Sequence, residues 1–400
     1  MAPTRRALLL GAAALAACRA TKDERAPVPL TASAPREPGP EAPPSAAPSV
    51  PAERASYALF DAFPELAKHV PRTELGRFPS RVEEATDLAR ELGVERLFIK
   101  RDDDVADLFG GGKVRKLELY FADAIAKGRT IVITSGGVGS NQAIATALFG
   151  RSLGLEVRLY LAPQPKSALV EKNLRADSVS GAKLALFPSV SEAERAAQKE
   201  VAAASGASAP YVVSPGGTTA LGTLGFVSGG LELAAAVKRG QLPEPARVYV
   251  ALGLGGSAAG IALGCALGGL GSEIVAVRAS NPGTVSIGKL HAIAADAARA
   301  ANALDPSFPA KVKIRARIDG RFVGAGYGSP TEAAREAIAK AARAGLELDP
   351  VYTGKAFAAI VADGEASGGK AGKGPSLFWN TQSSRPLAEG PIPKGFERFF

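Results

Sequence analysis

The sequence predicts an α/β protein built on parallel sheets. Short apolar runs recur after residue 90, and most are continuous rather than alternating, as expected for strands buried on both faces. Longer alanine-rich segments with helix signals separate these runs. Strands that alternate with helices are typical of parallel sheets, which bind ligands at the carboxyl ends of their strands. The expected strands are 96–100, 130–135, 156–162, 183–188, 211–215, 247–253, 273–279 and 312–318.

Length and composition favour an ordinary globular body. The chain has 400 residues, of which 46% are hydrophobic, and this is enough for two domains with cores of their own. The net charge of +9 is spread among interleaved acids and bases. The most basic stretch, 311–317, alternates with apolar residues, so we interpret it as the exposed face of one strand rather than a nucleic-acid site. Two cysteines and two distant histidines predict neither a disulfide framework nor a metal site.

The first eighteen residues resemble a bacterial lipoprotein signal. Arg5 and Arg6 precede an apolar run that ends at Cys18 and is shorter than the roughly 20 residues that span a bilayer. We expect Cys18 to be acylated and to anchor the protein in the cell envelope; an ordinary cleaved signal is the alternative. The paired arginines are also typical of twin-arginine export, which carries folded proteins. Residues 19–56, rich in Pro, Ala and Ser, are predicted to be a disordered linker.

A glycine-rich turn follows the expected strand 247–253. Gly253, Gly255, Gly256 and Gly260 allow a tight turn that aims several backbone N–H groups at one point, where the next helix begins. Such a point attracts an anion, and a phosphate fits best. The glycines also partly match a dinucleotide fingerprint, but the next strand ends without the acid that holds a ribose. A tight turn without a ligand is the remaining alternative.

The clearest helix signals lie between residues 329 and 345. Ser329 is expected to cap this helix, Pro330 to fit its first turn, Glu332 to complete a capping box and Gly345 to end it. This helix would follow the last of the expected strands.

Six motifs occur in one order along the chain. They are LFIKRDDDVADLFGGGKVRKLE, SGGVGSNQ, SPGGTTALGTLGFVSGGLEL, GLGGSAAG, GYGSPTEAAREAI and LELDPVYTGKAF. Together, from about residue 78 to 361, they resemble the D-cysteine desulfhydrase and 1-aminocyclopropane-1-carboxylate deaminase family of pyridoxal-phosphate enzymes. The resemblance implies the tryptophan synthase β-like fold, with two domains, three-layer parallel sheets and often a homodimer. It places a smaller α/β domain at about 116–225, inserted in a larger one formed by 57–115 and 226–400.

The resemblance assigns the cofactor site first. Lys113 would form the Schiff base with pyridoxal 5′-phosphate, and Lys116, one helical turn further on, would reach the cofactor phosphate. A nucleophilic lysine needs a lowered pKa, and we interpret the three glycines before it as clearance for the flat ring. The phosphate cradle is expected at the glycine-rich turn, from Gly255, Gly256, Ser257 and Ala258.

The resemblance also assigns residues to the substrate. Ser140, Asn141 and Gln142 are expected at the start of a helix, whose free N–H groups suit the carboxylate of an amino acid. In the family, Ser140 contacts the substrate and takes part in proton transfer, while Asn141 binds the ring hydroxyl. Helix capping by Ser140 or Asn141 is a simpler role that is compatible with both.

Three further residues match the family near the carboxyl end. Tyr327 and Tyr352 correspond to active-site tyrosines that assist proton movement. Thr353 stands where deaminases place a glutamate at the ring nitrogen. A neutral hydroxyl there gives a weaker electron sink, which favours elimination of a good leaving group such as a thiolate.

These assignments predict a pyridoxal-phosphate dependent lyase that converts D-cysteine, or a related thiol amino acid, to pyruvate, ammonia and sulfide. A 1-aminocyclopropane-1-carboxylate deaminase or another lyase of the fold is the alternative, and an envelope-tethered binding protein without catalytic activity is a further one. Two departures from the family bear on the substrate pocket. Gly112 replaces a usual asparagine, and residues 380–384 replace a His-Thr-Gly-Gly segment.

Overall fold

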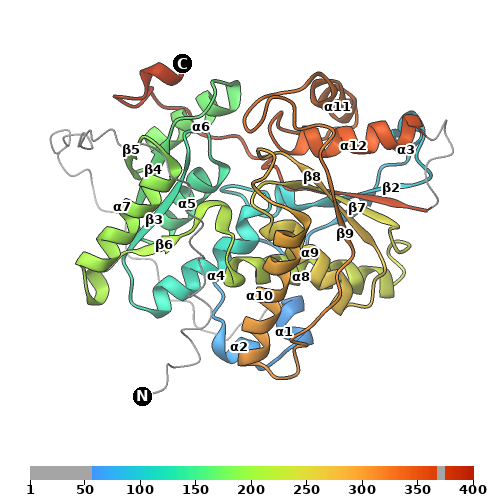
Figure 1. The fold of residues 1–400 in the computed structure, drawn as a ribbon, viewed down its shortest axis with the longest axis horizontal. Coiled ribbons are helices and arrows are strands. Elements are labelled where there is room, and N and C mark those ends of the chain that lie inside the picture. The colour runs from blue at the N-terminus through green and yellow to red at the C-terminus, as the bar shows by residue number, and fades with distance from the viewer. Residues whose placement is uncertain (1–55, 367–373) are drawn as a thin grey trace, which may run out of the picture.

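The computed structural model describes residues 56–366 and 374–400 (Figure 1). The predicted signal segment, Cys18 and nearly all of the predicted linker lie outside the described residues. Within them the chain forms two separate sheets, each flanked by helices, and this confirms the predicted α/β class.

The larger sheet has six strands in the order β1-β2-β10-β7-β8-β9. All neighbours are parallel except β1 and β2. The last strand of the chain therefore lies in the middle of the sheet, between strands that come much earlier. The expected strand 312–318 begins only at Ala316. The strands are β1 (Val82–Glu84), β2 (Leu97–Arg101), β7 (Arg247–Leu252), β8 (Glu273–Arg278), β9 (Ala316–Asp319) and β10 (Ser376–Asn380).

The smaller sheet has four parallel strands in the order β5-β4-β3-β6. It lies inside the segment 116–225 that the sequence assigns to the smaller domain. Three helices pack around it, and two of them, α5 and α7, contact its strands directly. Its elements are β3 (Ile131–Gly137), α5 (Asn141–Ser152), β4 (Glu156–Ala162), α6 (Ala168–Val179), β5 (Lys183–Leu186), α7 (Val190–Ala203) and β6 (Tyr211–Val213).

A layer of apolar helices packs beneath the larger sheet. Helix α8 (Ala220–Lys238) has the length and hydropathy of a membrane-spanning helix, but most of it is buried against α9 (Gly256–Leu267) and α4 (Lys113–Ala126). Small residues let α8 and α9 approach closely, since a Cβ at Gly264 would lie 2.2 Å from the Val227 carbonyl oxygen. The other α-helices are α1 (Ala58–Ala62), α2 (Leu66–His69), α3 (Thr86–Leu92), α10 (Ile287–Leu304), α11 (Glu332–Arg343) and α12 (Thr353–Ala366).

Helix α11 corrects one detail of the sequence analysis. Its cap is Thr331, whose Oγ1 accepts a hydrogen bond from the Ala334 N–H at 3.2 Å, and not Ser329. The capping residue must lie immediately before the first helical residue, and the helix begins two residues later than expected. Gly345 follows the helix with φ +71°, as expected for a residue that ends it.

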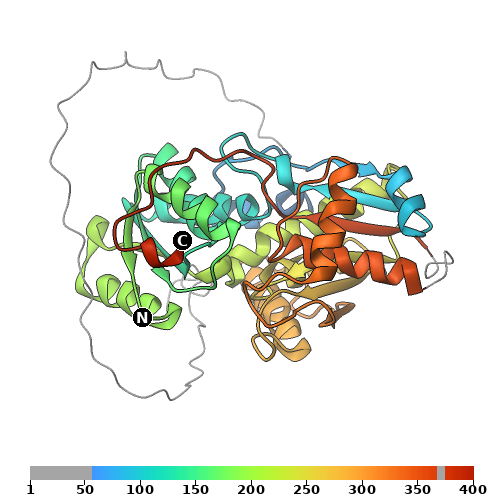
Figure 2. The same cartoon turned by 90° about the horizontal axis from the view of Figure 1, so that it is seen from above.

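The carboxyl-terminal segment connects the two parts of the molecule. After β10 it leaves the larger sheet and crosses to the smaller one (Figure 2). Phe396 and Phe399 are buried there in an apolar cluster with residues of β4, α5 and α6. On the way, the Gly390 N–H donates a hydrogen bond to the Arg175 carbonyl oxygen of α6 at 3.1 Å.

Candidate active site

A cavity of about 600 Å³ brings together nearly all the predicted site residues. Residues at the carboxyl ends of four strands line the cavity: β3 in the smaller sheet, and β7, β8 and β10 in the larger one. This is the edge at which a parallel sheet is expected to bind ligands. Thr353 is the one predicted residue that is not among its lining residues. The predicted residues that line it are Lys113, Lys116, Ser140, Asn141, Gln142, Gly255, Gly256, Ser257, Ala258, Tyr327 and Tyr352.

Lys113 begins helix α4 and faces this cavity. Burial lowers the pKa of its ammonium to about 8, although the carboxylate of Asp349 acts in the opposite direction. A large fraction of this side chain is therefore neutral near pH 8, and a neutral amine is the form that attacks a carbonyl group or accepts a proton.

The glycines before Lys113 pack closely against other parts of the protein. A Cβ at Gly110 would lie 1.8 Å from the Asp103 carbonyl oxygen, and one at Gly111, which has φ +87°, would lie 2.6 Å from the Thr381 carbonyl oxygen. A Cβ at Gly112, which also lines the cavity, would lie 2.7 Å from the Phe226 ring. The packing of this loop therefore requires glycine at these positions, and clearance for a ring stays a prediction.

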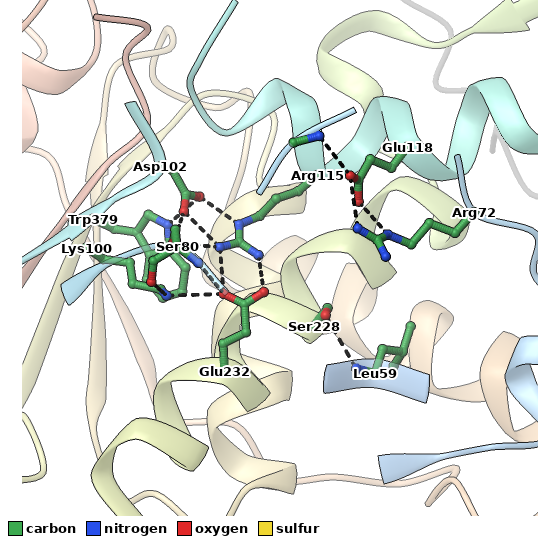
Figure 3. A network of polar contacts seen from close by, with 11 residues as sticks. Leu59, Arg72, Ser80, Lys100, Asp102, Arg115, Glu118, Ser228, Glu232 and Trp379 are labelled. Carbon is green, nitrogen blue, oxygen red and sulfur yellow. Dashed lines mark hydrogen bonds and ion pairs between the residues drawn. The ribbon is translucent and has the colours of Figure 1, made fainter. Parts of the chain in front are cut away.

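Buried charges hold α4 against the larger sheet (Figure 3). Arg115 donates to both carboxylate oxygens of Asp102, at 2.7 and 2.8 Å, and to both of Glu232, at 2.8 and 2.9 Å. Lys100 donates to Glu232 at 3.1 Å, and the Trp379 indole N–H donates to Asp102 at 2.7 Å. All five side chains are buried. Because Arg115 lies two residues after Lys113, the network fixes the position of the helical turn that carries Lys113.

The other end of the cavity fits a phosphate group. Lys116 is buried, and its Nζ donates to the Gly216 carbonyl oxygen at 2.8 Å. Burial and the charge of Lys113 lower its pKa well below the usual range, so no anion offsets burial here. A Cβ at Gly256, the first residue of α9, would lie 3.2 Å from both Lys116 Nζ and Thr218 Oγ1. A helix N-terminus and a lysine without a counter-charge thus converge, and a bound phosphate dianion would raise the pKa of this lysine and pair with its ammonium.

The predicted substrate residues form the start of α5. Ser140 caps this helix, and its Oγ accepts a hydrogen bond from the Ala143 N–H at 3.2 Å. Nearby, Gln142 Oε1 and Ser135 Oγ are buried and have no hydrogen-bond partner among the described residues, although both side chains line the cavity. Buried polar atoms are normally paired, so these atoms point to a polar ligand.

The two tyrosines contact each other. The Tyr352 hydroxyl donates to the Tyr327 oxygen at 3.0 Å. Burial is the main cause that raises the pKa of each phenol, so both stay protonated through the neutral range. Because the Tyr352 hydroxyl already donates to Tyr327, the Tyr327 hydroxyl is the donor of the pair that remains for a ligand.

The sequence analysis missed a carboxylate beside these tyrosines. Asp349 lines the cavity, and Thr353 lies behind it, with its hydroxyl donating to Asp349 Oδ2 at 2.7 Å. Backbone N–H groups of Val351, Tyr352 and Thr353 hold the same carboxylate at 2.9, 2.7 and 3.1 Å. The sequence signal was present, because an aspartate followed by a proline is typical of a turn in which the carboxylate accepts a hydrogen bond from the N–H two residues further on. Thr353 therefore positions an acid and does not itself face the cavity.

Two more lining residues escaped the sequence analysis, and a third, Gln382, lies in the segment 380–384 that it marked only as a departure from the family. Ser280 lies two residues after β8 and has a buried hydroxyl with no partner among the described residues. Asn281 follows it and accepts a hydrogen bond from the Tyr327 N–H at 2.7 Å. Gln382 follows β10 and contacts Asn141 across the cavity. No local motif marks these residues.

Comparison with known proteins gives a consistent result. Residues 73–374 match the family described as pyridoxal-phosphate dependent enzyme. The chain is 36% identical over 338 residues to nocardicin C-9′ epimerase of Nocardia uniformis subsp. tsuyamanensis, covering 81% of this chain and 97% of that protein. It is 34% identical to a D-cysteine desulfhydrase of Klebsiella pneumoniae, covering 79% and 95%. It is 33% identical to a putative 1-aminocyclopropane-1-carboxylate deaminase of Pyrococcus horikoshii, covering 75% and 88%.

Solved structures agree with the predicted fold. The structure of a 1-aminocyclopropane-1-carboxylate deaminase homologue superposes with a TM-score of 0.69 at 29% identity, covering 82% of this chain and 95% of that one. A threonine deaminase from Solanum lycopersicum shares the fold with a TM-score of 0.55 at 18% identity. The family resemblance inferred from the six motifs and the predicted fold class are confirmed.

Proposed function

The chain belongs to the pyridoxal-phosphate dependent enzymes, and we propose that it catalyses β-elimination from a small amino acid, with D-cysteine or a related thiol amino acid as the substrate. The products would be pyruvate, ammonia and sulfide. The observation that carries this proposal is the pairing of a lysine of lowered pKa, Lys113, with a phenol that keeps its proton, Tyr327, in one cavity. Elimination needs both a base for the α-proton and an acid for the leaving group.

Residues of this chain can perform each step of the proposed elimination. The bound cofactor supplies an electron sink for the charge left on the α-carbon. The N–H groups at the start of α5 and the Ser140 hydroxyl bind the α-carboxylate. Lys113 Nζ accepts the α-proton, and Tyr327 donates its phenolic proton to the departing sulfur. Tyr352 orients Tyr327 through the 3.0 Å hydrogen bond between their hydroxyls.

Asp349 changes the argument for this substrate. The sequence analysis favoured elimination because Thr353 offers no charge to the cofactor ring, yet a carboxylate does line the cavity. The support for a thiol substrate therefore comes from the acid at Tyr327 and from the likeness to D-cysteine desulfhydrases, and not from a weak electron sink.

Product analysis tests the proposal. Purified protein with bound cofactor should release pyruvate from D-cysteine and from β-chloro-D-alanine. Lys113→Ala should lose this activity together with the visible absorption that borohydride treatment removes, whereas a variant of an exposed lysine, Lys199→Ala, should keep both. Release of 2-oxobutyrate from 1-aminocyclopropane-1-carboxylate would instead indicate a deaminase. Exchange of the α-proton with solvent deuterium and no keto acid would indicate an epimerase, the activity named for the Nocardia relative.

The location of the protein is a separate proposal that rests on residues 1–18. We propose that a lipid on Cys18 anchors the enzyme in the cell envelope after export in the folded state. Labelling of cells with a clickable palmitate should mark the protein, and Cys18→Ser should abolish the label. A Cys18→Ser protein that is processed and located like the unchanged one would refute the anchor.

A further inference from the structure

The segment after β10 holds one side chain of the cavity in a fixed place. The Gly112 N–H donates to the Thr381 carbonyl oxygen at 3.1 Å, and both the N–H and the hydroxyl of Ser384 donate to the Asp103 carbonyl oxygen at 3.0 Å. Gln382 lies between these two attachments, and its side chain lines the cavity. Its position is therefore set by the loop that precedes Lys113.

A chain of three amides determines which way Gln382 faces. Asn173 Nδ2 lies 2.9 Å from the Gly139 carbonyl oxygen, which can only accept, so this atom is the nitrogen of its amide. The same Nδ2 donates to Asn141 Oδ1 at 2.8 Å. Asn141 thus turns its own Nδ2 outward, where it meets Gln382 Oε1 at 3.4 Å. The oxygen of Gln382 faces Asn141, and its Nε2 is directed elsewhere.

Gln382 Nε2 has no hydrogen-bond partner among the described residues. The side chain is half-buried, it comes from the segment after β10 of the larger sheet, and its Oε1 lies 3.4 Å from Asn141 Nδ2 at the start of α5. A bound amino acid whose carboxylate lies at the α5 N–H groups would have its α- and β-carbons beside this amide. The unpaired Nε2 of Gln382 would then face the β-substituent.

We propose that Gln382 is a substrate-recognition residue whose Nε2 donates a hydrogen bond to a carbonyl or carboxylate oxygen in the β-substituent of the amino acid. This inference rests on the proposed β-elimination and narrows its substrate class. The preferred substrates within the proposed class are D-cysteines whose sulfur carries a group with a carbonyl or carboxylate oxygen, so that the leaving group is still a thiolate. A site built to donate a hydrogen bond discriminates against an analogue that lacks the acceptor, because the donor is then left unpaired.

Two substrates with good leaving groups test this recognition. O-acetyl-D-serine carries a carbonyl oxygen in its β-substituent and β-chloro-D-alanine does not, while both release pyruvate on elimination. We measure kcat/KM for each with the unchanged enzyme, with Gln382→Met, which keeps the length of the side chain, and with Gln382→Glu, which replaces the donor by an acceptor. Loss of one hydrogen bond should lower the ratio of O-acetyl-D-serine to β-chloro-D-alanine about tenfold in Gln382→Met. In Gln382→Glu the ratio should fall further.

Controls separate the possible failures. Gln241 is an exposed glutamine after α8 that does not line the cavity, and Gln241→Met should leave the ratio unchanged. If both substrates react and Gln382→Met keeps the unchanged ratio, the inference is refuted while the proposed elimination stands. If the unchanged enzyme releases pyruvate from neither substrate, the elimination itself has failed.

A binding measurement decides the inference in that second case. The dissociation constants of D-asparagine and D-alanine, measured by calorimetry on the protein with bound cofactor, compare a ligand that has a side-chain carbonyl with one that lacks it. In Gln382→Met, the affinity for D-asparagine relative to that for D-alanine should fall about tenfold. An unchanged ratio would overturn the role of Gln382. If Gln382→Met does not fold, Gln382→Asn, which keeps the amide but withdraws it by one methylene, provides the same comparison.

Discussion

The buried charges behind the first turn of α4 should respond strongly to one substitution, Arg115→Met. Arg115 places five hydrogen bonds on Asp102, Glu232 and Ser80 (Figure 3). Methionine fills much of the same volume but leaves the two buried carboxylates with Lys100 as their remaining cation. A buried charge that has lost its partner costs far more free energy than the intact ion pair contributes to stability.

The size and the pH dependence of the loss follow from the same contacts. Removing one partner of a buried ion pair costs about 3–5 kcal/mol, which corresponds to a fall of roughly 4–7 °C in Tm for a folded body of this size. Burial alone would raise the pKa of Glu232, but Arg115 and Lys100 outweigh burial and hold it at about 2. A carboxyl with a lowered pKa stabilises the folded state above its unfolded pKa, and this stabilisation is lost as the pH falls towards 2. Without Arg115 the pKa of Glu232 rises, so the deficit of the variant is largest at neutral pH and shrinks below about pH 5.

Thermal unfolding followed by circular dichroism at pH 7 and pH 4.5 measures both effects. A matched control is Arg335→Met, which breaks an exposed ion pair with Glu332 and should change stability by less than about 1 kcal/mol. The double variant Arg115→Met, Glu232→Gln should regain part of the loss, because it removes one unpaired charge. If the Tm of Arg115→Met lies within about 2 °C of that of the unchanged protein at pH 7, the network does not stabilise this fold.

Three further predictions concern other parts of the site. Asp349→Asn removes the carboxylate that raises the pKa of Lys113, so the midpoint of amine labelling in the cofactor-free protein should fall below about pH 8; an unmoved midpoint would contradict the assignment. Gly111→Ala places a Cβ 2.6 Å from the Thr381 carbonyl oxygen at φ +87° and should cost at least about 1–2 kcal/mol in urea unfolding, whereas a neutral result would show that loop packing does not require this glycine. Phe396→Ala should cost about 3–5 kcal/mol and increase proteolysis of the smaller domain first; uniform digestion would argue against a link to that domain.

The sequence predicted the features that depend on neighbours in the chain. The continuous apolar strands, the glycine turn before α9 and the cap at Ser140 each need only a few consecutive residues. Lys113 and Lys116 were assigned by the family resemblance, and both line the cavity. The order of the strands could not be predicted in this way, because β10 pairs with β2 and β7 through contacts that no local pattern records.

The sequence could not show which residues tertiary pairing brings together at the cavity. Asn141 was predicted, but its contact with Gln382, 241 residues away, exists because the segment after β10 passes the start of α5. Asp349 was visible as a turn residue, but only the fold shows that its carboxylate lines the cavity with Lys113. Thr353 lies in the right segment, but its hydroxyl donates to Asp349 and its side chain does not line the cavity.

The two departures from the family are one structural change. Gly112 and the segment after β10 appear independent in the sequence, yet the Gly112 N–H donates to the Thr381 carbonyl oxygen at 3.1 Å. A Cβ at Gly112 would lie 3.1 Å from Thr381 Cγ2, so the asparagine expected at position 112 would not fit beside this segment without movement. The residue next to Thr381 is Gln382, whose amide lines the same cavity. The loop pair therefore brings an amide to the cavity from the segment after β10, and this amide is the reason to expect a preference among β-substituents.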